Sequence, residues 1–353
     1  MTSSDLGVNS GNEIEYDVGT EFIDMCADEY VAISSDAWAT TPLSSEAGPF
    51  SVNAQCWHAG PCMLSQMTVG PYVFEINPVH IDNEGPILVF EKVLSGFEYG
   101  ERGGDDIYYG PGPIYLHGHK QLGRSIGTRV TVQELYVPRE MVGLAQGKTA
   151  PNSLIYPTSL IGRIVHAEWE TVFNAVTDGE TKVSAQLFER FAAAIKIALG
   201  VNPQREDVRT QSRELLLRQI QRFIVQNLES PDLSVDFILG RHGVSRASLY
   251  RMFEPYGGIR NYVTNLRASK TLMDIWQNES QRGIVRSMQT RWGFSSGNDF
   301  NRTVRRLFGN TPKRLISGPS TNGGVLDQSI GFARDFVDQR WSGTRDAPAS
   351  VAA

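Results

Sequence analysis

The sequence predicts an α+β fold in which a β-rich region is followed by a helical one. From about residue 21 to 142, short segments rich in Val, Ile, Tyr and Phe alternate with Gly/Pro turns. Many short strands with frequent turns are typical of a β-barrel or a sandwich. After Pro157 the apolar residues recur at helical spacing as far as about residue 317. We therefore expect a β-barrel, a helical hairpin and then an all-α domain.

The distribution of charge separates the same two regions. The chain has 353 residues and a formal net charge of −6, which by itself argues weakly against a nucleic-acid partner. Residues 210–318, however, contain 17 Lys and Arg against 8 Asp and Glu, a net charge of +9, so the remainder carries −15. A basic segment within an acidic chain indicates nucleic-acid binding.

Composition also limits the cellular setting. No stretch of about 18 uncharged apolar residues is present, so we expect no membrane partner. The acidic N-terminal residues lack the layout of a signal peptide, so we expect a cytoplasmic protein. Three cysteines, an odd and small number, imply no disulfide framework.

The elements divide the chain into six segments. Strands are expected, for example, over 71–76, 86–93, 107–116 and 129–137. Two apolar stripes separated by Asp178-Gly179 predict a helical hairpin, and a polar stretch containing Pro203 predicts a linker. The segments are a flexible N-terminus 1–20, a β-barrel 21–148, the hairpin 149–200, a linker 201–212, an all-α domain 213–318 and a tail 319–353.

Two helix-turn-helix units are predicted in the basic segment, over 235–256 and 284–307. In each, a glycine that can adopt the left-handed conformation ends the first helix. An apolar residue then fills the core beneath the turn, and a serine can cap the next helix. The turns are Gly243-Val244-Ser245 and Gly293-Phe294-Ser295, with Ser296 as an alternative cap in the second.

The second helix of each unit has one apolar face and one polar, basic face. An exposed basic helix after a tight turn is what entry into the DNA major groove requires. Arginines on one helix can also be no more than a solvated face, but two copies with the same turn chemistry favour binding. The apolar faces contain Leu249, Met252 and Phe253, and then Phe300, Val304, Leu307 and Phe308.

This segment resembles the C-terminal domain of the AraC/XylS family of bacterial transcription regulators over about 100 residues. The matching motifs are Gly243-Val244-Ser245, Leu249–Phe253, Gly257-Gly258, Leu266-Arg267, Gly293-Phe294-Ser295, Asp299–Arg302, Arg305-Arg306, Phe308-Gly309 and Thr311-Pro312. The chain departs from the family at Leu239 and Gln289, where a small alanine usually lies at a close helix crossing. We expect a looser crossing there, or one adjusted by nearby residues.

The resemblance implies a bilobed domain whose two recognition helices enter successive major-groove segments, about 34 Å apart, joined by a linker helix over 259–276. Base contacts are expected from the first and second recognition helices, since arginine suits guanine and asparagine suits adenine. Phosphate or core contacts are expected from Arg305, Arg306, Lys313, Arg314 and Arg267. The predicted DNA-binding residues are Arg246, Ser248, Tyr250, Arg251, Ser296, Asn298, Asp299, Arg302, Arg305 and Arg306.

The N-terminal region resembles, more weakly, the cupin-like companion domain of part of that family, from Tyr109–Pro113 through Val137–Met141 into the hairpin. The resemblance implies a barrel that holds a small-molecule effector and helices that form a homodimer. We expect an activator that responds to the effector and binds double-stranded DNA and RNA polymerase. By analogy with other members of the family, we expect it to control a catabolic operon. The candidate effector pocket is Trp57, Phe74, Phe90, Tyr108 and Tyr115, although such aromatics also form ordinary cores.

Two clusters of residues suggest a metal-binding site. Surface histidines and buried free thiols are the simpler explanations. In His117-Gly118-His119 the imidazoles would share one strand face, with His80 or His58 as further ligands, but a nearby carboxylate is missing. The spacing from Cys56 to Cys62 is not a standard zinc spacing. The sequence contains no nucleophile elbow, P-loop or dinucleotide fingerprint, so we expect no catalytic residue, metal or cofactor. The alternatives are a metal-dependent cupin-type enzyme with an accessory helical domain and a ligand-independent repressor.

Overall fold

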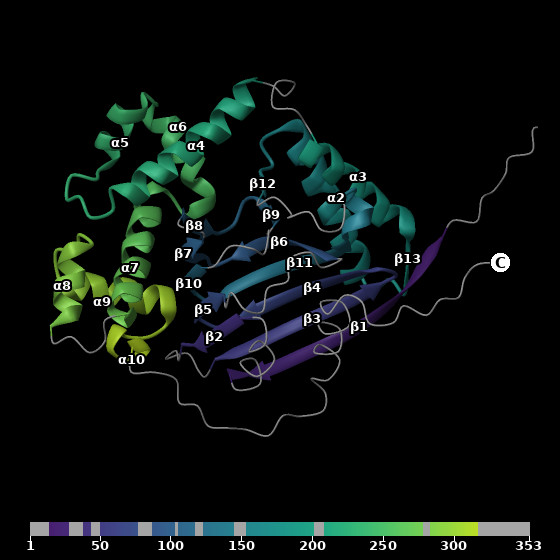
Figure 1. Ribbon diagram of the computed structural model, residues 1–353, viewed down its shortest axis with the longest axis horizontal. Coiled ribbons are helices and arrows are strands. Elements are labelled where there is room, and N and C mark those ends of the chain that lie inside the picture. Colours follow the sequence, from purple (N-terminus) through teal and green to yellow (C-terminus); the bar gives the residue numbers. More distant parts are fainter. Residues whose placement is uncertain are drawn as a thin grey trace, which may run out of the picture.

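A sheet-rich N-terminal part and a helical C-terminal part lie side by side in the computed structural model (Figure 1). The structure describes residues 14–27, 38–43, 50–76, 87–102, 105–116, 123–144, 153–200, 208–277 and 283–316. Antiparallel sheets followed by helices confirm the predicted α+β fold class. Among the described residues, no helix combines the length and the apolar character needed to cross a membrane. The tail 319–353 lies outside the described residues.

The larger sheet has eight antiparallel strands. Residues 15–20 are not flexible as expected, because they begin strand β1 (Glu15–Cys26). Residues 15–17 pair with β13 (Lys182–Ser184), and residues 18–26 pair with β3 (Ser51–Ala59). Residues 1–13 of the expected flexible segment lie outside the described residues. In order across the sheet, the strands are β12 (Ser153–Ile155), β9 (Ile114–Leu116), β6 (Ile87–Ser95), β11 (Val130–Pro138), β4 (Cys62–Val69), β3 (Ser51–Ala59), β1 (Glu15–Cys26) and β13 (Lys182–Ser184).

The smaller sheet has five strands. One of them is the first half of a segment that the sequence predicts as a single strand. Residues 107–116 divide between β8 (Asp105–Tyr109) and β9, which belong to different sheets. Pro111 and Pro113 lack the N–H that a ladder needs, and Gly112 has a φ of 134°, so pairing stops between them. The order is β2 (Trp38–Pro42), β5 (Tyr72–Ile76), β10 (Gly123–Gly127), β7 (Glu98–Arg102) and β8 (Asp105–Tyr109).

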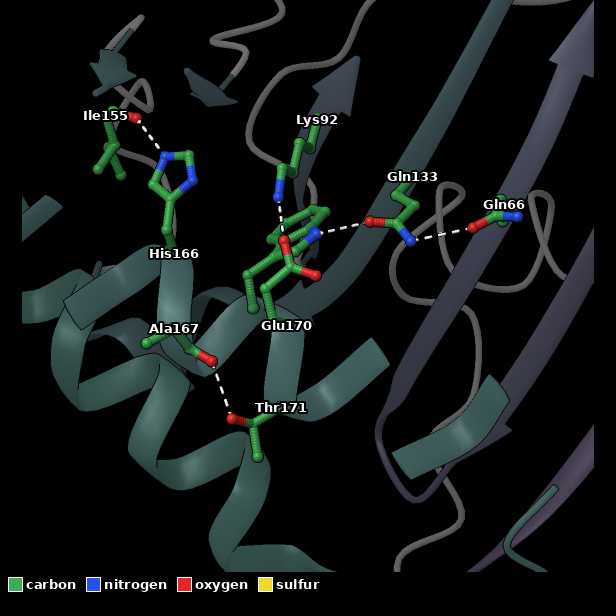
Figure 2. Close-up of polar contacts among 9 residues, drawn as sticks. Gln66, Lys92, Gln133, Ile155, His166, Ala167, Glu170 and Thr171 are labelled. Carbon is green, nitrogen blue, oxygen red and sulfur yellow. Dashed lines mark hydrogen bonds and ion pairs between the residues drawn. The ribbon is translucent and has the colours of Figure 1, made fainter. Parts of the chain in front are cut away.

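Helices α2 (Leu160–Thr177) and α3 (Ala185–Gly200) form the predicted hairpin and pack on one face of the larger sheet. The buried indole Nε1 of Trp169 donates to Gln133 Oε1 at 2.9 Å, and Gln133 Nε2 donates to Gln66 Oε1 at 2.9 Å. Figure 2 shows these two consecutive hydrogen bonds beside the ion pair that joins Lys92 on β6 to Glu170 on α2. These polar contacts fix the hairpin on the sheet within an otherwise apolar interface.

The opposite face of the larger sheet carries a second apolar cluster and the partly buried carboxyl group of Glu134. Ser65 Oγ and Tyr136 OH donate to the carboxylate of Glu134 at 2.9 and 2.7 Å. Burial, and then the nearby charge of Glu91, raise the pKa of Glu134 to about 7. The side chain is therefore half protonated near neutral pH.

The C-terminal part is helical throughout. Helix α4 begins inside the expected linker 201–212, because its first turns contain no glycine or proline to interrupt a helix. The two helix-turn-helix units and the linker helix agree within a residue with the expected bounds 235–256, 284–307 and 259–276. The helices of this part are α4 (Val208–Gln226), α5 (Val235–His242), α6 (Arg246–Phe253), η4 (Glu254–Tyr256), α7 (Ile259–Gln277), α8 (Ile284–Arg291), α9 (Gly297–Phe308) and α10 (Pro312–Ile316).

The smaller sheet and the helical part share one apolar core. The ring of Tyr108 on β8 stacks on Phe97 with centroids 5.2 Å apart. It also meets Tyr256 and Tyr262 edge to face at 5.5 and 4.8 Å. Nearby, Arg218 on α4 lies 5.8 Å from the ring centroid of Tyr156. Aromatic packing therefore holds the N-terminal part against α4, η4 and α7.

Candidate nucleic-acid interface

The first helix-turn-helix is built by α5 and α6. Ser234 caps α5, and Gly243 ends it in the left-handed conformation with a φ of 63°. Ser245 then accepts a hydrogen bond from the backbone N–H of Ser248 at 3.2 Å and so caps α6. Leu249 and Phe253 are fully buried, which turns the rest of α6 toward solvent.

The second helix-turn-helix is built by α8 and α9. Gly293 lies in the left-handed region with a φ of 76°, as predicted from its position. The cap of α9 is Ser296 rather than Ser295, because Ser296 Oγ accepts from the N–H of Asp299 at 3.2 Å. Phe300 and two further apolar residues one and two turns later are fully buried.

Arg267 on α7 supports the second turn from the inside. Its Nε donates to the carbonyl of Leu228 at 3.0 Å, and its Nη2 donates to the carbonyl of Ser230 at 2.9 Å. The guanidinium lies against Gly293, where an added Cβ would come within 2.9 Å of Arg267 Cζ. Partial burial lowers the pKa of Arg267. Of the two roles that the sequence left open, the structure places this arginine in the core.

The two residues that depart from the family pattern are accommodated differently. Leu239 is partly buried against the helical core. Gln289 on α8 lies beside the first residue of α9, which is Gly297, and an added Cβ on that glycine would be 3.5 Å from Gln289 Oε1. The small residue Gly297 on α9 therefore lies beside Gln289, which is larger than the alanine usual in the family. The helix crossing is thus adjusted by a nearby residue, which is one of the two outcomes expected from the sequence.

The predicted contact residues of α6 lie on its exposed side. Arg246, Ser248, Tyr250 and Arg251 are all exposed. Arg246 forms an ion pair with Asp236 on α5. Both partners are largely exposed, so this pair contributes little to stability and can open easily.

The predicted contact residues of α9 are exposed except for Asp299, which is half-buried. The carboxylate of Asp299 accepts from Ser296 Oγ at 3.0 Å and forms an ion pair with Arg302 at 2.7 Å. Asp299 thus takes part in capping its own helix. Arg306 turns toward α7, where its Nη2 donates to Asn265 Oδ1 at 2.9 Å. The remaining exposed members are Ser296, Asn298, Arg302 and Arg305.

The five residues of the candidate effector pocket lie in three different environments. Trp57 and Phe90 are buried under the α2–α3 hairpin. Tyr115 lies in the apolar cluster on the opposite face, where its hydroxyl donates to the carbonyl of Gly110 at 2.8 Å. Tyr108 belongs to the junction with the helical part, and Phe74 lies on β5 of the smaller sheet.

The candidate metal residues do not converge in the described part of the chain. No group of three or more His, Cys, Asp and Glu side chains that could hold a metal occurs among the described residues. Cys56 and Cys62 are both buried, and burial raises the pKa of the Cys56 thiol to about 12. His80, His117 and His119 lie outside the described residues.

Sequence reasoning gave no role to the residues that join the two parts, such as Asn265, Tyr256 and Tyr262. Tyr262 contacts Tyr108, which is more than 150 residues away in the sequence. No local spacing can signal such a contact, because neither residue lies near its partner along the chain.

No family model matches the chain. Among solved structures, the AraC-like transcriptional activator CuxR is similar to 76% of this chain and all of its own, with 16% identity and a TM-score of 0.41. ToxT from Vibrio cholerae O395 covers 87% of this chain and 99% of its own, with 10% identity and a TM-score of 0.29. A cupin-2 domain protein from Rhodospirillum rubrum covers 40% of this chain and 88% of its own, with 14% identity and a TM-score of 0.19.

Proposed function

We propose that this chain is a sequence-specific DNA-binding transcription regulator whose recognition helices are α6 and α9. The observation that carries the proposal is the repeated geometry. Two helices each follow a left-handed glycine and a serine cap, and each presents exposed polar and basic side chains. Both belong to a segment with a net charge of +9. Such helices fit two successive major-groove segments.

The ion pairs on these helices are compatible with DNA binding. Arg302 is 81% exposed and its partner Asp299 is 45% exposed, so opening the pair costs at most about 1 kcal/mol. A bidentate contact from the freed guanidinium to guanine contributes about 1–3 kcal/mol of discrimination, which exceeds that cost. Arg302 is therefore the residue from which we expect the clearest base preference.

The first test is a random-site selection with the full-length chain, followed by titration of the selected duplex at several salt concentrations. We expect an enriched sequence and an affinity that falls as salt rises, because phosphate contacts release counterions. A selection that enriches no sequence, or binding that ignores salt, contradicts the proposal.

The second test separates base contacts from phosphate contacts. Arg302→Ala is expected to cost about 1–3 kcal/mol and to relax the preference at one base position. Arg305→Ala is expected to weaken all sequences about equally and to reduce the salt slope by about 1. Lys182→Ala, on β13 of the larger sheet, is the control that removes one exposed positive charge and leaves DNA binding unchanged, because both Lys182 and its partner Glu15 are largely exposed.

We further propose that a small-molecule effector controls the protein, that it activates transcription through RNA polymerase, and that it acts as a homodimer in the cytoplasm. Exposed apolar residues on the hairpin, Ile164 on α2 and Ile197 on α3, support a dimer surface there. Pairing of subunits would place four recognition helices on two half-sites and raise affinity through effective concentration. Sedimentation of the wild type and of Ile197→Glu tests the dimer, and a change to monomer is expected for the variant.

The target genes follow from a genome-wide footprint of the bound protein. Genes of small-molecule catabolism beside the occupied sites, with expression that falls when the protein is removed, are the expected result. Expression that rises on removal would instead identify a repressor.

A further inference from the structure

The outer margin of the larger sheet contains a strand edge that is paired over only part of its length. On one side, residues 18–26 of β1 pair with β3. On the other side, β13 pairs only with residues 15–17, and the carbonyl of Thr181 accepts from the N–H of Val18 at 2.9 Å. Among the described residues, no strand pairs with the outer side of residues 19–26. We call this stretch the open edge of β1.

Backbone polar groups of the open edge point away from the sheet. The N–H of Val18 is directed away from β3, toward Thr181. Alternate residues of a strand direct their backbone groups to the same side, so Thr20, Phe22 and Asp24 direct their N–H and C=O groups outward. All three residues are exposed, and the described part of the chain offers these outward groups no partner. Such a row of groups is a template for another strand.

The side chains of the open edge provide little protection against pairing. Proteins commonly protect an edge strand with lysine, proline or a β-bulge. Residues 19–26 contain neither lysine nor proline, and their register with β3 is continuous. Phe22 is 79% exposed, so a large apolar ring lies in solvent at the middle of this edge. A partner strand would cover it.

The charged residues favour one register for a second copy of the same strand. In an antiparallel pair centred on Phe22, the two Phe22 rings are neighbours, Thr20 lies opposite Asp24 of the second copy, and Glu21 lies opposite its Ile23. A centre on Glu21 or on Asp24 instead places two carboxylates directly opposite each other, which is destabilising. A centre on Ile23 places Phe22 opposite Asp24. The register centred on Phe22 is therefore the most favourable.

The length of the open edge fits the same register. Pairing centred on Phe22 places Val18 opposite Cys26 of the second copy. Strand β13 occupies the edge as far as Asp17, and β1 ends at Cys26. The second strand therefore ends where β13 begins, and two copies can pair without displacing β13.

We propose that a second copy of this chain pairs with the open edge of β1, antiparallel and centred on Phe22, so that two larger sheets join into one. Figure 1 shows β1 along the outer margin of the larger sheet, whereas α6 and α9 lie at the left of the view, beyond the smaller sheet. The pairing therefore leaves both recognition helices free.

This contact is smaller than a typical permanent interface. It involves residues 19–25 of each chain, whereas a standard interface has about 20–30 residues a side. The pairing is therefore weaker than the dimer proposed on the α2–α3 hairpin and joins such dimers into tetramers at high protein concentration. Only the number of four chains rests on the proposed function; the edge pairing does not.

The test is sedimentation velocity of the full-length chain, without DNA, from about 1 to about 500 µM. We expect the number of chains per particle to double as the concentration rises. Thr20→Pro removes one outward N–H from each copy, so two hydrogen bonds are lost and the doubling should weaken about tenfold or more. Phe22→Lys should weaken it too, because like charges then lie opposite each other. Leu94→Lys on β6 is the matched control, since it also replaces an exposed apolar residue, away from the open edge.

Disulfide cross-linking tests the register in a Cys26→Ser background. Phe22→Cys should form a cross-linked pair on mild oxidation, because Cα atoms of residues directly opposite each other are about 5.5 Å apart, within disulfide range. Thr20→Cys is the control. Its two copies lie four residues apart along the paired strands, at about 13 Å, and should not cross-link.

Several results would overturn the proposal. A wild-type chain that does not double at high concentration refutes it, which includes the case in which another segment of the same chain covers the edge. Doubling that is unchanged in both Thr20→Pro and Phe22→Lys, or equal cross-linking of the two cysteine variants, refutes it as well. Equal urea midpoints for Phe22→Lys and wild type exclude misfolding as the cause of any loss.

Ile197→Glu separates this inference from the proposed hairpin dimer. The variant should be a monomer at low concentration and should still pair at high concentration through β1. A variant that never associates refutes the edge pairing. An intact dimer in Ile197→Glu, together with doubling that is lost in Phe22→Lys, refutes only the hairpin surface.

Discussion

The second turn of the helical part offers a sharp test of how the fold is held together. Gly293 lies at a φ of 76°, and a Cβ added there would come within 2.9 Å of Arg267 Cζ and 3.1 Å of its Nη1. In Gly293→Ala, the left-handed conformation costs about 1–2 kcal/mol, of which about 0.4–1 kcal/mol is offset because alanine also restricts the unfolded chain. The backbone effect alone therefore amounts to about 1 kcal/mol.

The larger effect comes from Arg267, which the new methyl group displaces. Its hydrogen bonds to the carbonyls of Leu228 and Ser230 are 3.0 and 2.9 Å long, and we expect a shift of the guanidinium to break one of them. Loss of one charge-assisted hydrogen bond costs about 1.5–3 kcal/mol. We expect the free energy of unfolding to fall by about 2.5–4 kcal/mol in total.

The chain contains a matched control for this substitution. Gly243 occupies the same position in the first unit, with a φ of 63°, but no heavy atom lies within 4 Å of its added Cβ. Gly243→Ala should therefore show only the backbone effect of about 1 kcal/mol.

Urea unfolding of the full-length variants, followed by far-UV circular dichroism, measures the difference as a shift of midpoint at constant slope. In an Arg267→Ala background, Gly293→Ala should cost no more than Gly243→Ala does. If Gly293→Ala and Gly243→Ala destabilise the wild-type chain equally, the steric argument is refuted.

Three further predictions concern single side chains. Trp169→Phe removes the hydrogen bond to Gln133 and leaves a buried amide oxygen without its donor, so unfolding should become easier by about 1–3 kcal/mol in urea titrations. The raised pKa of Glu134, about 7, means that the folded state retains a proton which the unfolded state loses above its ordinary value of 4.5. Stability should therefore fall by up to about 3 kcal/mol as the pH rises from 4.5 to 7, and Glu134→Gln should flatten that dependence; an unchanged slope would contradict the burial argument. Ser296→Ala should cost about 1 kcal/mol, because it removes the cap of α9, whereas Ser295→Ala should cost less; a larger loss for Ser295→Ala would contradict the assigned cap.

The helical part was predictable because its signals are local. The helices around Gly243 and Gly293 begin and end within a residue or two of the expected positions, since capping and left-handed turns depend on neighbours within one helical turn. The β-rich part was less predictable at its edges. The segment 15–20 is polar and resembles a flexible end, but strand pairing with residues far along the chain makes it part of β1.

The sequence alone determined that a β-rich region precedes a helical hairpin and an all-α region, and it determined the two turns and the concentration of positive charge in residues 210–318. Each of these depends on composition or short-range spacing. Only the tertiary structure decided the use of individual arginines. Arg267 supports a turn, Arg306 faces Asn265 at the junction, and Arg302 remains 81% exposed. The first two partners lie about 40 residues away in the chain, so no pattern within one helix could distinguish these arginines.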